Sequence, residues 1–149
     1  MGSLMPPSSG MVYVDANAVI YSVEKHPLYG PLLLPLWQAA QAKTIEVVSS
    51  ELVLLEVLIG PLRNGDVALA NAYEQLFHQP QTRLLPITLP ILKEAARLRA
   101  LFPALKTPDA VHAATALFSS CTMFLSNDPG FRRVSTLPAV ILDDLIATP

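Results

Sequence analysis

Short apolar runs alternate with longer amphipathic stretches along the chain. Five runs rich in β-branched and aromatic residues predict strands over Met11 to Val14, Ile45 to Val48, Arg83 to Ile87, Thr122 to Leu125 and Ala139 to Leu142. The stretches between them have helical spacing and predict helices over Pro31 to Lys43, Ser50 to Leu62, Asp66 to Gln79, Pro90 to Phe102 and Pro108 to Ser119. Most of the 14 prolines lie at the boundaries of these elements, where a fixed φ is tolerated.

The predicted strands are apolar on both faces. Such strands, alternating with helices, are typical of a mostly parallel central sheet, here of about five strands, flanked by helices on both sides. With 149 residues and no internal repeat or linker, we expect one α/β domain over residues 11–146. Residues 1–10 lack the regions of a signal peptide, and we expect a disordered N-terminal segment or an expression scar there.

The composition excludes a disordered chain and a membrane span. Hydrophobic residues make up 52% and charged residues 15% of the chain, and the mean hydropathy is +0.42. No run reaches the roughly 20 consecutive apolar residues that a spanning helix needs. Cys121 is the single cysteine and cannot form an internal disulfide, which fits a reducing, cytoplasmic location.

Two aspartates follow predicted strands directly. Asp15 comes after the first strand and Asp128 after the fourth, and ligands of open parallel sheets bind outside the carboxyl ends of the strands. An aspartate at such a turn is also a common helix N-cap. Both interpretations, a cap and a functional carboxylate, stay open for these two residues.

Two further acids lie on predicted helices. Asp109 falls in the first helical turn after Thr107-Pro108, and the small residues behind it would let the helix approach the sheet closely. Glu56 lies in a nearly apolar helix, where it either faces solvent or points into a cleft. Glu51 does not share its helical face, so the cleft is favoured.

Converging carboxylates repel one another unless a divalent cation neutralises them. A set of oxygen ligands favours Mg²⁺ or Mn²⁺ over zinc, and such ions activate water and stabilise displacement at phosphorus. The chemistry that Asp15, Glu56, Asp109 and Asp128 point to is phosphoester hydrolysis.

These residues also carry a resemblance to a known family. From Val12 to about Leu142 the sequence resembles the PIN-domain nucleases, and most closely the VapC-type toxin ribonucleases of toxin–antitoxin pairs. The matching motifs are Asp15-Ala16-Asn17, Ser49 with Leu52, Val53 and Glu56, the stretch from Thr107 to Ala116, and the stretch from Ser126 to Phe131. Ser126 stands where threonine is frequent in the family and keeps the hydroxyl.

The resemblance implies a PIN-like three-layer sandwich and a Mg²⁺- or Mn²⁺-dependent endoribonuclease. It implies Asp15, Glu56, Asp109 and Asp128 as catalytic metal ligands, with Asn17 and Ser126 as polar support. It further implies an RNA substrate, a cognate antitoxin protein that blocks the site, and a homodimer. The surplus of apolar residues fits such protein interfaces on the helices over 31–43, 50–62 and 66–79.

Four other residues could contribute to the site. Lys106, Arg132 and Arg133 flank Asp109 and Asp128 in sequence and are either RNA-binding residues at the rim or ordinary surface charges. His112 lies one helical turn after Asp109 and either approaches the metal or, as favoured, packs or forms hydrogen bonds between helix and sheet.

Two alternative functions remain from the sequence. Asp15 with Asn17 loosely resembles the Asp-x-Asp of haloacid-dehalogenase phosphatases, but Asn17 lacks the second carboxylate. A non-catalytic PIN-like module that binds RNA or protein is the other alternative, and the presence of all four acids weighs against it.

The charge balance is compatible with RNA. The ten Lys and Arg against twelve Asp and Glu give a net charge of -2, which excludes a general nucleic-acid coat. Setting the four site acids aside leaves ten cations against eight anions, or +2 outside the site.

Overall fold

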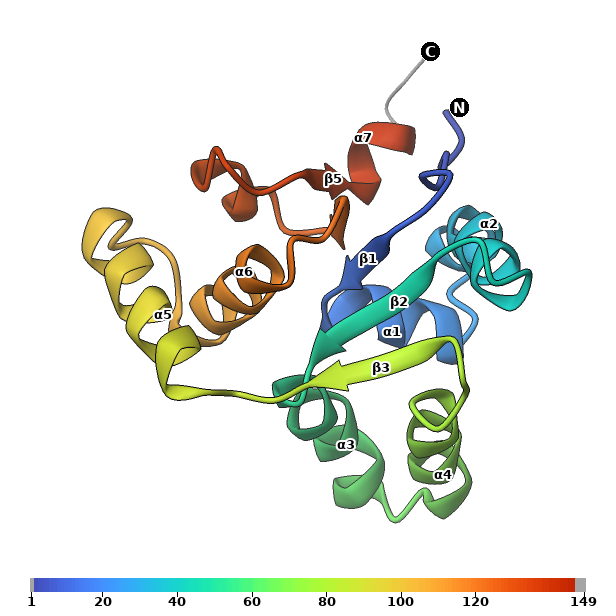
Figure 1. Cartoon of the computed structure of the whole chain (residues 1–149). Helices are drawn as coiled ribbons and strands as arrows, with labels where there is room; N and C mark the ends of the chain where they lie inside the picture. The colour runs from blue at the N-terminus through green and yellow to red at the C-terminus, as the bar shows by residue number, and fades with distance from the viewer. Residues whose placement is uncertain (1, 147–149) are drawn as a thin grey trace.

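A computed structural model describes residues 2–146 and shows a five-stranded sheet in which every pairing is parallel (Figure 1). The strand order is β3-β2-β1-β4-β5. The strands are β1 (Met11–Val14), β2 (Glu46–Ser50), β3 (Thr82–Leu85), β4 (Met123–Ser126) and β5 (Ala139–Ile141). In register, Val12 of β1 pairs with Val47 of β2 on one side and with Met123 of β4 on the other. The predicted fold class is confirmed.

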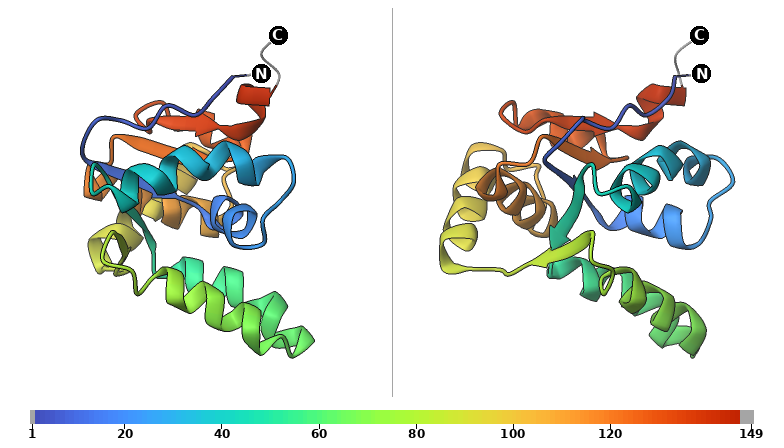
Figure 2. Two further views of the ribbon diagram at one scale, coloured as in Figure 1. Left: turned by 90° about the vertical axis from the view of Figure 1, so that its right-hand side faces the viewer. Right: turned by 45° about the vertical axis from the view of Figure 1, so that its right-hand side comes forward.

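Helices cover both faces of this sheet. They are α1 (Ala16–Val23), α2 (Tyr29–Gln41), α3 (Leu52–Asn64), α4 (Val67–Leu76), α5 (Leu89–Leu101), α6 (Thr107–Ser119) and α7 (Leu142–Ile146), with a 3₁₀ helix, η1, over Pro129–Arg133. Helices α5 and α6 lie on one side and α1 and α2 on the other, while the α3–α4 pair extends away from the sheet (Figure 2). The five predicted helices correspond to α2 to α6, whereas α1, α7 and η1 were not predicted.

Alternate residues of each strand enter two separate apolar layers. Tyr13 of β1 and Phe124 of β4 are buried in the layer under α5 and α6, and their rings stack with centroids 5.0 Å apart. Val12, Val14 and Leu125 enter the layer under α1, α2 and α3. Both faces of the central strands are therefore covered, as parallel sheets require.

Helix α6 is the most deeply buried helix among the described residues. Every side chain from Ala110 to Ala116 is buried, and the alanines pack in the same cluster as Tyr13 and Phe124. Small side chains permit this close approach to the sheet. The close approach expected from this stretch is confirmed, and Asp109 lies in the first turn of α6, which begins at Thr107.

The chain before β1 packs against the domain. Leu4 is buried at 3% exposure, and the Gly2 N–H donates to the Leu145 carbonyl at 2.7 Å. Met1 lies outside the described residues, and the disordered segment or expression scar expected over residues 1–10 stays a prediction. A domain boundary at residue 11 stays a prediction. None of the helices described over residues 2–146 is long and apolar enough to cross a membrane.

Candidate active site at the carboxyl edge of the sheet

Asp15 follows β1 and caps α1. Its Oδ1 accepts the Ala18 N–H at 3.1 Å, so the cap interpretation is correct. The side chain is nevertheless buried, and burial raises the pKa of Asp15 to about 6, against the opposing effects of hydrogen bonds from Ser126 and Ala18. A carboxylate buried beside a polar strand end is suited to bind a cation as well as to cap a helix.

Ser126 and Asp128 form the turn after β4. The fully buried Ser126 hydroxyl accepts the Asp128 N–H at 2.9 Å and also contacts Asp15. Asp128 Oδ1 accepts the Gly130 N–H at 2.8 Å and caps η1. Because β1 and β4 are neighbours at the point where the strand order changes direction, Asp15 and Asp128 belong to the same edge of the sheet.

Asp109 belongs electrostatically to the same group. Its pKa is raised mainly by burial and then by the negative charge of Asp128, with a smaller contribution from Glu56. His112 and Lys106 lower it in part. The fold thus brings acids from α3, the start of α6 and the end of β4 within electrostatic range of one another.

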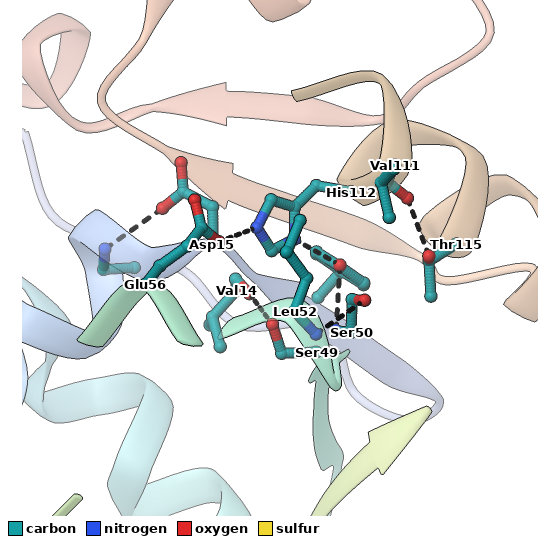
Figure 3. A network of polar contacts seen from close by, with 11 residues as sticks. Val14, Asp15, Ser49, Ser50, Leu52, Glu56, Val111, His112 and Thr115 are labelled. Carbon is teal, nitrogen blue, oxygen red and sulfur yellow. Dashed lines mark hydrogen bonds and ion pairs between the residues drawn. The ribbon is translucent and has the colours of Figure 1, made fainter. Parts of the chain in front are cut away.

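Glu56 ends a chain of buried hydrogen bonds (Figure 3). Its Oε1 lies 2.5 Å from His112 Nε2, and His112 Nδ1 lies 2.6 Å from the Tyr13 hydroxyl. That hydroxyl accepts the Ser50 N–H at 2.9 Å. Glu56 therefore points inward from α3, which is the orientation that the sequence favoured. His112 forms hydrogen bonds between helix and sheet, which is also the interpretation that the sequence favoured.

The four predicted carboxylates do not form a complete metal-coordination site in the described structure. Over residues 2–146, no three His, Cys, Asp or Glu side chains are grouped so that they could hold a metal ion together. Two acids have protein partners instead, since Asp128 binds the Gly130 N–H and Glu56 binds His112. The assignment of these four residues as metal ligands stays a prediction.

Sequence reasoning did not identify Tyr13 or Ser50 as members of this network. Tyr13 carries the only polar side-chain group in β1, and it is fully buried. Ser50 is the second of two serines that end β2, and Ser49 donates to the Val14 carbonyl at 2.6 Å. Polar groups at the ends of otherwise apolar strands are the signal that could have found them.

The predicted supporting and rim residues lie near the same edge. Asn17 is exposed in the first turn of α1, and Lys106 immediately precedes α6. Arg132 is paired with Asp144, and Arg133 Nη1 lies 3.5 Å from the Gly130 carbonyl oxygen. Arg132 thus has a protein partner that the sequence did not suggest.

Comparisons with known proteins place this architecture in a family. The PIN domain model matches residues 12–137, which is most of the chain, so the chain belongs to the PIN-domain family. The predicted family membership is confirmed. A comparison with curated protein sequences gives no significant match.

Solved structures with the same fold include toxin–antitoxin complexes. VapBC2 from Rickettsia felis, bound to a DNA fragment from its promoter, is similar with a TM-score of 0.71 and 16% identity, covering 88% of this chain and 98% of that chain. FitAcB from Neisseria gonorrhoeae gives a TM-score of 0.68 and 17% identity over 91% and 100% of the two chains. A toxin–antitoxin complex from Klebsiella pneumoniae gives 0.66 and 17% over 88% and 97%. At these identities the likeness shows a shared fold.

Proposed function

We propose that this protein is a divalent-metal-dependent endoribonuclease that acts as the toxin of a toxin–antitoxin pair. The observation that carries the proposal is the group of acids at the carboxyl edge of the sheet in a PIN-domain fold, where burial and then the charges of Asp128 and Glu56 raise the pKa of Asp109. Asp15, Glu56, Asp109 and Asp128 are the proposed catalytic metal ligands. Asn17 and Ser126 support them.

The donor set fits Mg²⁺ or Mn²⁺. All four groups are carboxylates, and burial raises the pKa values of Asp15 and Asp109, a cost that a bound cation would offset. When bound, such an ion supplies an activated water and stabilises negative charge at phosphorus. Asp128 and Glu56 each use one carboxylate oxygen in the hydrogen bonds to Gly130 and His112, so the other oxygen of each carboxylate is the proposed ligand atom.

The surrounding residues hold the acids in place. Ser126 joins Asp15 to the backbone of the turn that carries Asp128, so the ends of β1 and β4 are fixed relative to each other. Burial raises the pKa of Asp109 and Lys106 offsets part of that rise; with Arg132 and Arg133, Lys106 is proposed to contact the phosphates of RNA at the rim. The family match leaves the haloacid-dehalogenase alternative without support.

Two features support protein partners. The similar structures include complexes of toxins with antitoxins. On this chain Leu55, Ile59 and Leu62 follow one another at helical spacing along α3 and are 61%, 47% and 70% exposed. We therefore propose a cognate antitoxin and a homodimer in the cytoplasm. Elution as a monomer at every micromolar concentration tested would exclude the homodimer.

A cleavage assay with a matched control tests the proposed function. RNA and single-stranded DNA are incubated with wild type, Asp109→Asn and Asp66→Asn, each with Mn²⁺ and with EDTA. Asp66 is an N-cap outside the site whose Oδ1 accepts the Leu69 N–H at 3.0 Å, so its variant controls for the charge change alone. The expected result is RNA cleavage by wild type and Asp66→Asn with Mn²⁺ only. RNA binding without cleavage by wild type would instead identify a non-catalytic module.

A further inference from the structure

We infer that His112, held in place by Tyr13, is a positioning residue that fixes the Glu56 carboxylate at the active site. The inference deepens the proposed function and rests on it. It concerns residues from three elements that lie far apart in sequence: Tyr13 on β1, Glu56 on α3 and His112 on α6. Figure 3 shows the imidazole lying beside the Glu56 carboxylate.

The donors and acceptors available along this series of hydrogen bonds determine which group donates in each bond. The Tyr13 oxygen accepts the Ser50 N–H, so its own proton is available to the facing His112 Nδ1. With Nδ1 as acceptor, the ring proton of the neutral imidazole is on Nε2, and it is donated to Glu56 Oε1. Each member therefore fixes the next, beginning at the β2 backbone.

Burial makes this arrangement hard to change. The His112 side chain is 2% exposed, and among the described residues no buried side-chain nitrogen or oxygen lacks a hydrogen-bond partner. Rotation of the ring would leave the Tyr13 hydroxyl and an imidazole nitrogen unpaired away from water, at a cost of about 1–3 kcal/mol for each group. The ring is consequently a rigid support for the carboxylate.

Glu56 needs such a support because its own helix supplies none. Its neighbours Leu55 and Val57 are apolar, and its side chain remains 25% exposed, which leaves the carboxylate accessible to a ligand. An unsupported glutamate has several rotamers to lose when it binds a cation. Hydrogen-bonded partners behind a ligand typically change metal affinity by about 10- to 100-fold.

The chain offers matched controls for both polar partners. Tyr73 is a second fully buried tyrosine whose hydroxyl donates to a carboxylate, that of Glu24, in the other apolar layer. Thr115 is a fully buried polar residue one turn after His112, and its hydroxyl donates to the Val111 carbonyl within α6. Neither hydroxyl forms a described hydrogen bond with Glu56, His112 or Tyr13, so Tyr73→Phe and Thr115→Val each remove a buried hydroxyl and keep the hydrogen bonds of the network.

Calorimetric titration with Mn²⁺ alone, without RNA, is the primary measurement. His112→Leu keeps the bulk of the ring and removes its donor, and it is expected to weaken Mn²⁺ binding by about 10-fold or more. His112→Gln retains an N–H donor at a similar distance along the side chain and should recover part of the affinity. Tyr13→Phe should weaken binding as well, whereas Tyr73→Phe and Thr115→Val should not.

A double-mutant cycle separates positioning from general stability. If His112 acts through Glu56, His112→Leu should have little further effect on Mn²⁺ affinity in a Glu56→Gln background. The loss of thermal stability that His112→Leu causes would be the same in the wild-type and Glu56→Gln backgrounds. If His112→Leu fails to fold, His112→Gln and Tyr13→Phe carry the same comparison.

The outcomes distinguish the inference from the proposed function. Wild type that neither binds Mn²⁺ nor cleaves RNA would overturn the proposed function and the inference with it. Wild type that does both, with unchanged Mn²⁺ affinity in folded His112 and Tyr13 variants, would overturn the inference alone. Additive effects of His112→Leu and Glu56→Gln would likewise assign His112 a purely structural role.

Discussion

Asp15 and Asp128 each accept a backbone N–H at the start of the helix that follows their strand, and the two strands are parallel neighbours. Asp15 Oδ1 binds the Ala18 N–H at 3.1 Å and Asp128 Oδ1 binds the Gly130 N–H at 2.8 Å. From the sequence, cap and functional carboxylate were competing interpretations. In the structure the cap orients each carboxylate at the edge of the sheet, so the two roles are compatible.

Substitution of Asp128 separates these roles. Asp128→Asn keeps an oxygen for the Gly130 N–H and loses only the charge, whereas Asp128→Ala also loses the cap, which is worth about 1 kcal/mol. We expect the Ala variant to be less stable than the Asn variant by about that amount in urea unfolding. Both should lose Mn²⁺ affinity in calorimetric titration. Equal stabilities would show that the Asp128 cap contributes nothing to folding.

The pH dependence of stability reports on Asp15. Burial raises its pKa from 3.8 to about 6, so the folded protein keeps a proton that the unfolded chain releases. The contribution of Asp15 to the free energy of unfolding therefore falls as pH rises from about 4 to 6 and stays lost above that range. Asp15→Asn does not titrate, and in EDTA at pH 7 it should be more stable than wild type by roughly 3 kcal/mol.

Urea unfolding of wild type and Asp15→Asn between pH 4 and pH 7 measures this difference. The advantage of the variant should shrink toward pH 4, where wild-type Asp15 is protonated in the fold. Added Mn²⁺ should stabilise wild type and leave the variant unchanged. A wild type that gains stability relative to the variant as pH rises would contradict the sign of this shift.

The sheet and five helices could be predicted because each has a local signal. Apolar runs give the strands, a proline lies in the first turn of both α5 and α6, and Thr88 caps α5. Helix α1 was missed because Val19, Ile20 and Tyr21 have strong β-propensity and its eight residues span only about two helical turns. Helix α7 has only five residues and begins directly after β5, which the sequence could not separate from the strand.

The four acids could be chosen from the sequence because each has a recognisable place at a strand end or on a helix. Their partners could not, since the bond between Glu56 and His112 joins residues 56 positions apart, and that between Tyr13 and His112 joins residues 99 apart. Only the order of β2, β1 and β4 in the sheet and the close approach of α6 bring these groups together. No spacing rule within one element contains that information.

The alanines of α6 should not tolerate larger side chains. Ala113 is fully buried in the cluster that contains Tyr13 and Phe124, so Ala113→Leu forces extra methylenes into a filled space. Overpacking of this kind costs about 1–3 kcal/mol. Ala96→Leu on the exposed face of α5 is the matched control and should change the free energy of unfolding by less than about 0.5 kcal/mol. Urea unfolding of both variants decides this, and equal effects would contradict close packing of α6.

The two arginines of η1 should differ in their contribution to RNA cleavage. Arg132 is already paired with Asp144, whereas Arg133 has a 3.5 Å contact with the Gly130 carbonyl oxygen, so Arg133 is more readily recruited to a phosphate. We expect Arg133→Gln to raise the KM for RNA about threefold to tenfold, with kcat nearly unchanged, and to reduce the slope of log affinity against log salt by about 1. Arg132→Gln should have a smaller effect, since it also releases Asp144.

Arg97→Gln, which removes the cation paired with Glu94 on the exposed face of α5, is the control and should leave the salt slope unchanged. A salt slope that falls equally in Arg97→Gln and Arg133→Gln would show that these cations act through net charge alone, and would remove Arg133 from the proposed RNA-binding rim.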